Sequence, residues 1–292
     1  MGALIDVNTD GLAKLGEVIS YGLGLTAFGR KKMADAESYA AIKQAETNTQ
    51  VELIKQKGAE EIANYILAKE TRKLDNTKSV IEKAKSYLPK GEPVSNEPVN
   101  TDWINRFFNI VEDISDKTLH DIWGRILAGE IKSPNSYSLR TLERLRNITK
   151  EEAELFVKAT QYYIANNFIC TEKIFLSLDE TLLLGETGLI NNEDLTKNWK
   201  VEANGKLDIL IDNETLFLLH NDTSREIRCS ISVNKVSKSG IEVLSLIEKS
   251  DRSEFYSALA KFFKSKGVSR VSKHKTIWNG EELRYIIAGD EL

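Results

Sequence analysis

Apolar residues recur every three or four positions through the middle of the chain, which is the period of an amphipathic helix. Two runs are clear between residues 101 and 132. The first contains Ile104, Phe107, Phe108, Val111 and Ile114, and the second contains Leu119, Ile122, Trp123, Ile126 and Leu127. Asp102 or Thr101 is suited to cap the first helix and Ser115 the second, because side-chain oxygens accept the exposed N–H groups of a first turn.

Two shorter helices are predicted after these runs. Pro134 cannot continue helical hydrogen bonding, so the second helix is expected to end at residues 133–135. A third helix begins at Ser138, and Thr149 followed by Glu152 is a capping-box pattern that opens a fourth. The stretch 101–190 is therefore predicted to be a helical core.

The N-terminal segment, residues 12–29, has two distinct faces. Its apolar face consists of Leu12, Leu15, Ile19 and Leu23. Small residues that let two helices approach closely recur every four positions, at Gly16, Ser20 and Gly24. The uncharged part, residues 18–29, is too short to span a bilayer, which takes about 20 residues.

Three readings of this segment stay open: an anchor at a membrane surface, an assembly helix, or a helix that docks on its own chain. The basic cluster at residues 30–32 suits anionic lipid headgroups. The residues assigned to assembly or membrane contact are Leu12, Leu15, Gly16, Ile19, Ser20, Leu23, Gly24, Phe28, Arg30, Lys31 and Lys32.

A long helix is predicted next, because residues 30–75 contain no proline and a single glycine, Gly58. A broken apolar stripe runs along it through Val51, Ile54, Gly58, Ile62, Tyr65 and Ile66. Such a stripe needs a partner, which is either another chain or a second helix over residues 76–88. Residues 89–100 then hold three of the four prolines and give the clearest signal of a domain boundary.

The C-terminal part mixes helices and strands. Helices are predicted over 176–190, 239–249 and 252–266, and strands over 199–203, 206–211, 215–220 and 226–233. Asn204-Gly205 is a hairpin signal, and a last hairpin of 268–278 with 283–288 is expected to turn at Asn279-Gly280. The fold class is thus mainly α with a C-terminal α+β domain: a long N-terminal helix, a central helical core and a small antiparallel sheet.

The predicted organisation has five parts: an anchor or assembly helix (1–32), a long helix or helical hairpin (33–88), a linker (89–100), the helical core (101–190) and the α+β domain (191–292). One basic run interrupts the last part, with no acidic residue between residues 261 and 275. Phosphate contact is one interpretation and a solvated face the other. The candidates for phosphate binding are Lys264, Lys266, Arg270, Lys273 and Lys275.

Charge and cysteine content restrict the classes of partner and the cellular location that the sequence predicts. The net charge of −4 over 292 residues gives no general field for nucleic acid. Two cysteines, Cys170 and Cys229, do not form a disulfide framework, which favours a reducing cytoplasm, with the inner face of the membrane as the alternative location. Cys170 follows an apolar run and is read as a small buried hydrophobe. No motif for a metal, a cofactor or a catalytic centre is recognised, so neither a cofactor nor an enzymatic reaction is predicted.

The stretch from 121 to 156 resembles an uncharacterised bacterial family known only as a domain of unknown function. The matching residues are Trp123, Leu127, Ala128, Gly129, Glu130, Pro134, Ser138, Leu139, Arg140, Leu142 and Phe156. Residues 27–37 are also similar to that family. A weaker similarity connects the same helix to the abortive-infection alpha proteins of bacteria. Within this motif Trp123, Glu130, Pro134, Ser138 and Arg140 are assigned structural roles. Glu130 is expected to pair with Arg140, and a site that binds a ligand or partner is the alternative.

Three functional hypotheses follow. The first is a non-enzymatic homo-oligomer, with binding to a membrane surface as an additional option. The resemblance implies a role in phage defence or stress for it. The second is a nucleic-acid-binding regulator that uses residues 261–275. The third is an enzyme whose site is built from residues far apart in the sequence.

Overall fold

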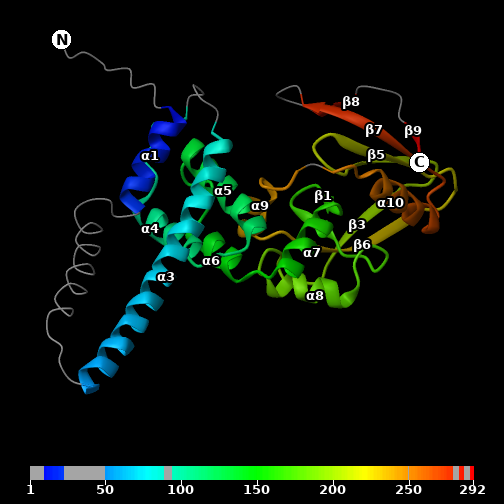
Figure 1. Cartoon of the computed structure of the whole chain (residues 1–292). Coiled ribbons are helices and arrows are strands. Elements are labelled where there is room, and N and C mark those ends of the chain that lie inside the picture. Colours follow the sequence, from blue (N-terminus) through cyan, green and yellow to red (C-terminus); the bar gives the residue numbers. More distant parts are fainter. Residues whose placement is uncertain (1–9, 23–49, 89–93, 249, 279–282, 286–289) are drawn as a thin grey trace, which may run out of the picture. The chain divides into compact units, whose positions relative to one another are not determined.

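The computed structural model describes residues 10–22, 50–88, 94–248, 250–278, 283–285 and 290–292, with the side chains of 50–56, 277–278 and 283–285 left aside (Figure 1). The chain divides into two compact units, Met1–Arg146 and Asn147–Leu292. The first is helical and the second is α+β, which confirms the predicted fold class. The division falls within the predicted helical core, whereas residues 94–100 of the predicted linker belong to the first unit.

The first unit contains the helices α1 (Gly11–Gly22), α3 (Gln50–Ser86), α4 (Thr101–Val111), α5 (Lys117–Lys132) and α6 (Leu139–Asn147). α3 continues without a break through Asp75, so the helical hairpin considered for residues 33–88 is wrong within its described part. The predicted caps are each shifted by one residue or more. Asn100 caps α4 and Asp116 caps α5, because both side chains accept N–H groups of the following turn.

Aromatic rings fill the centre of the first unit. Phe107 stacks on Trp103 with ring centroids 5.0 Å apart and meets the edge of Trp123 at 5.7 Å. All three side chains are buried. The indole N–H of Trp103 donates to the backbone oxygen of Tyr137 at 2.8 Å, so the polar group of this ring is satisfied inside the core.

α3 and α5 approach most closely at Gly124. A Cβ atom at this position would lie 2.5 Å from Cβ of Lys83 and 2.9 Å from the backbone nitrogen of Ala84. Glycine is therefore required by the close approach of two backbones, and not by its own dihedral freedom.

The second unit begins with α7 (Lys150–Thr160), which opens on the predicted Thr149–Glu152 capping box. The other helices are α8 (Leu178–Glu186), α9 (Lys238–Leu244) and α10 (Ser253–Ser265). One sheet has the order β1-β2-β6-β3, with β1 (Tyr163–Ile164), β2 (Phe168–Cys170), β6 (Ile227–Lys235) and β3 (Leu195–Val201). The other has the order β4-β5-β7-β8, with β4 (Lys206–Leu210), β5 (Thr215–His220), β7 (Arg270–Trp278) and β8 (Leu283–Tyr285), and β9 (Asp290–Glu291) also pairs with β7.

The hairpin predicted at Asn204-Gly205 is wrong, although the turn itself is present. Asn204 adopts a positive φ of 52°, and Gly205 donates its N–H to the oxygen of Glu202. The strands on either side pair elsewhere, β3 with β6 and β4 with β5. The turn leads from one sheet to the other, and both sheets pack with α10 into one core that includes Ile231, Phe217 and Phe263.

Gly124→Ala is expected to lower the free energy of unfolding by about 1–3 kcal/mol, because the added methyl group overlaps the backbone of α3. Gly58→Ala is the matched control, since a Cβ there meets open space and alanine favours a helix by up to about 1 kcal/mol. Urea denaturation followed by circular dichroism gives both values. Equal midpoints for the two variants would contradict the close approach at Gly124.

Candidate assembly surface

α1 docks on its own unit with one face. Gly11, Lys14, Leu15 and Val18 are buried, and the helix contacts α4 and α5. Its last residue, Gly22, lies so close to Phe108 that a Cβ atom would be 2.1 Å from the ring. The buried face is thus rotated slightly from the predicted apolar face, since Leu12 and Ile19 are only half-buried.

A buried charge fixes this docking. The ammonium group of Lys14 donates to the backbone oxygens of Ser95 at 2.8 Å and Glu97 at 2.6 Å. Only 4 % of Lys14 is exposed. Burial lowers the pKa of this amine, and Glu130 is the first of the carboxylates that act to raise it. Lys14 was not recognised in the sequence, because a single lysine beside apolar residues normally faces water.

Glu130 organises the loop after α5. Its two carboxylate oxygens accept the backbone N–H groups of Asn135 at 2.7 Å and Tyr137 at 3.0 Å, and 1 % of the residue is exposed. The expected pairing with Arg140 is wrong, because Arg140 is exposed on α6 while Glu130 is buried against backbone and Lys14.

The other motif residues lie in or beside the turn from α5 to α6, except for Trp123. Trp123 belongs to the core, and α5 ends at Lys132, just before Pro134, as predicted. The hydroxyl of Ser138 accepts the N–H of Thr141 at 3.3 Å in the first turn of α6. These positions therefore build the turn from α5 to α6.

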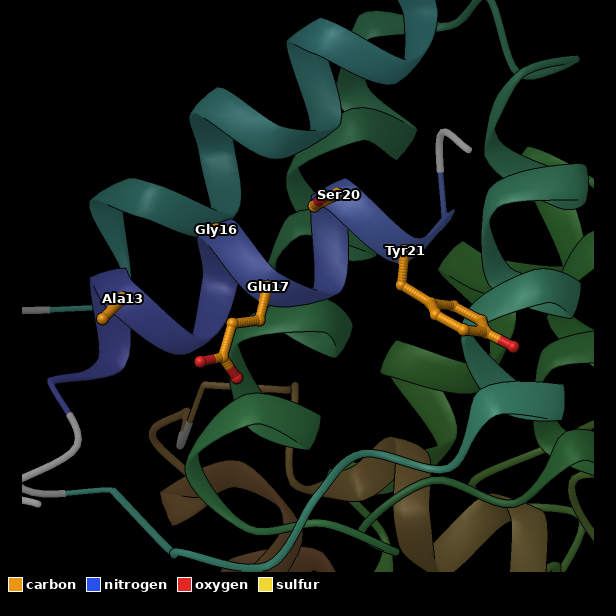
Figure 2. A pocket seen from close by; sticks show the side chains of 5 residues that line it. All are labelled: Ala13, Gly16, Glu17, Ser20 and Tyr21. Carbon is orange, nitrogen blue, oxygen red and sulfur yellow. The ribbon is translucent and has the colours of Figure 1, made fainter. Parts of the chain in front are cut away.

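The opposite face of α1 is exposed among the described residues. Gly16 and Ser20, two of the three predicted small residues, are exposed, and a Cβ at Gly16 would meet open space. With Ala13, Glu17 and Tyr21 they line a shallow groove on the outer side of the helix (Figure 2). The remaining residues of the predicted set lie outside the described part of the chain: Leu23, Gly24, Phe28, Arg30, Lys31 and Lys32. In the part that is described, no helix is both long and apolar enough to cross a membrane.

α3 is covered along one half only. Val80 and Ala84 are fully buried in its C-terminal half, which packs on α5. Toward its N-terminal end α3 extends beyond the other helices that the structure describes in this unit, and every residue from 60 to 72 is exposed (Figure 1). The exposed fractions are 63 % for Ile62, 70 % for Tyr65 and 53 % for Ile66.

The exposed and buried apolar residues of α3 share one face. Ile62 and Val80 are separated by 18 positions, which is five full turns at 3.6 residues per turn, and the same interval separates Ile66 from Ala84. A single stripe thus runs along the helix, covered by α5 at one end and open at the other. Leu67 is also exposed, at 66 %, but it lies roughly 100° around the helix from Ile66.

The predicted phosphate-binding residues do not form one surface. Lys264 and Lys266 lie at the end of α10, whereas Arg270, Lys273 and Lys275 lie on β7. Arg270 points to the opposite side of the sheet from Lys273, because alternate residues of a strand face opposite ways. Arg270 lies 3.5 Å from Asp222, and Lys273 is directly opposite Asp290 of β9.

Residues 60–180 match the model of a family described as a protein of unknown function, DUF2806. The match runs from the exposed half of α3 into α8 and includes the motif around Trp123 and Glu130, which confirms the resemblance to an uncharacterised family over this part of the chain. No curated protein and no solved structure matches the chain.

Glu130→Gln is expected to lower the free energy of unfolding by about 1–3 kcal/mol, because the amide of glutamine points an N–H donor at one of the two backbone N–H groups. Glu143→Gln removes a carboxylate of the same unit that pairs with Arg106 at the surface, and should cost less than about 1 kcal/mol. Urea denaturation measures both. A loss for Glu130→Gln no larger than for Glu143→Gln would show that the carboxylate does not hold the loop.

Cys170 is expected to resist alkylation by iodoacetamide in the native protein. Its side chain is fully buried, and burial raises the pKa of the thiol to about 12, so almost no thiolate is present at neutral pH. Mass spectrometry after labelling with and without urea checks this. Rapid labelling of Cys170 in the folded state would contradict the burial, while Cys229, also buried, should behave in the same way.

Proposed function

We propose that this protein is an assembly protein that associates with a second copy of itself through the uncovered stripe of α3. The observation that carries the proposal is the exposure of Ile62, Tyr65 and Ile66 on the face that the rest of α3 buries. Helices in proteins gain most of their stability by packing an amphipathic face. The exposed half of α3 has such a face and, among the described residues, no element that covers it.

The size of the stripe suits a weak, reversible pair. Full burial of a large apolar side chain stabilises by about 1.5–3 kcal/mol, and two copies would bury six such side chains. Loss of translational and rotational freedom on association costs about 4–15 kcal/mol. The two amounts are similar, so association is expected to depend on protein concentration.

The other hypotheses receive less support from the geometry. Arg270 and Lys273 point to opposite sides of the sheet and each has an acidic neighbour, which disfavours a nucleic-acid surface that uses both. A role in phage defence stays a prediction that rests on the weaker resemblance. Contact with a membrane surface stays a prediction, and the basic cluster at residues 30–32 on which it rests lies outside the described part of the chain.

Sedimentation velocity of the full chain at increasing concentration tests the proposal. The wild type should approach the mass of two chains, and Ile62→Ser combined with Ile66→Ser should stay at the mass of one. Leu67→Ser is the matched control, because it removes an equally exposed apolar side chain away from the stripe. A wild type that remains a single chain at every concentration, as expected if another segment of the same chain covers α3, would overturn the proposal.

A further inference from the structure

We infer that the two α3 helices cross antiparallel about a two-fold axis beside Ile66, with Glu61 of each copy opposite Arg72 of the partner subunit. This inference rests on the proposed self-association and adds its direction and register. It follows from where the charges of the exposed half lie relative to the apolar stripe.

The direction follows from Lys69. This residue is seven positions after Ile62, so it lies within about 20° of it and belongs to the stripe itself. Two parallel helices in register would place Lys69 against Lys69 of the partner subunit, with two like charges in contact. An antiparallel pair instead places Lys69 beside Ile62 and Glu61 of the partner subunit, where its carbon chain covers apolar surface and its ammonium meets a carboxylate.

The register follows from Glu61 and Arg72. They are eleven positions apart, which is three turns and about 20°, so both lie on the same flank of the stripe. A two-fold axis perpendicular to α3 keeps each flank on its own side and reverses the direction of the helix. With the axis beside Ile66, midway between the two residues, each Glu61 comes opposite Arg72 of the partner subunit.

These charges are available for a partner. Within the part of the chain that is described, Glu61, Lys69 and Arg72 are exposed and form no ion pair. The next cation along the stripe, Lys73, is already paired with Glu112 of the loop after α4. The uncommitted charges thus coincide with the uncovered part of the helix.

The same loop limits how the two helices meet. Asn76 donates to the backbone oxygen of Glu112 at 2.9 Å, so the stripe is covered by its own unit from about this position onward. A partner helix therefore crosses α3 at an angle and does not run along its whole length. Crossing near 50° is the commonest packing of helices in globular proteins. The contact is confined to residues 61–72.

Disulfide cross-linking of single-cysteine additions tests the register. The native cysteines are buried, so an added thiol on α3 reports without interference. In the antiparallel pair, two copies of Ile66→Cys lie beside the axis and should cross-link on mild oxidation. In two copies of Ile62→Cys, the Cα atoms of the added cysteines would be separated by about 13 Å along the helix. A disulfide allows at most roughly 7 Å between Cα atoms, so this variant should not cross-link.

Charge exchange provides the second test. Glu61→Arg and Arg72→Glu should each weaken the association on the order of tenfold, and the double variant should recover most of the loss. Equal cross-linking at positions 62 and 66, or a double variant no better than its parents, would overturn the antiparallel register while the measured dimer still supports self-association. If the wild type sediments as a single chain, the proposed function fails first.

Discussion

The carboxylate of Glu130 has almost no contact with water, and both of its oxygens accept backbone N–H groups from the loop that follows α5. An anion in such a place is stable only if every lone pair has a donor and a positive charge is near. Lys14 supplies the charge and is itself held by two backbone oxygens. Glu130 thus connects the end of α5 to the start of α6, and Lys14 connects α1 to the segment before α4.

These contacts fix α1 and the loop after α5, while one half of α3 stays exposed. α1 and the loop after α5 are fixed to the core, and α3 is fixed to α5 by the approach at Gly124. The rest of α3 continues the same apolar stripe beyond the last neighbour that covers it. Exposure of this apolar surface to water has an energetic cost, and the proposed second copy would remove it.

The sequence was sufficient for features that depend on local chemistry. The helical period around Phe107 and Trp123, the stop at Pro134, the capping box at Thr149 and the alternation of β6 all appear where they were expected. Features that depend on distant partners were missed. Asn204-Gly205 specifies a turn but not which strands pair, and the backbone oxygens that bind Lys14 belong to Ser95 and Glu97, more than 80 positions away in the chain.

For the candidate surface, the apolar stripe of α3 was readable from its period, but its division into covered and open halves was not. That division depends on where α5 and the loop at Glu112 end, which no local pattern encodes. The sequence also left open which face of α1 packs on its own chain. Its apolar face packs on its own unit, whereas Gly16 and Ser20 are exposed on the other side.

A straight helix clamped at one end behaves as a lever. Ile66 lies 10 positions, or about 15 Å, from Asn76, where α3 is held to the loop at Glu112, and the backbone between them is a continuous helix. A force applied near Ile66 exerts a torque on the packing between α3 and α5. At Gly124 the two backbones are already in close contact. A force on the exposed half of α3 is thereby transmitted to its packing against α5.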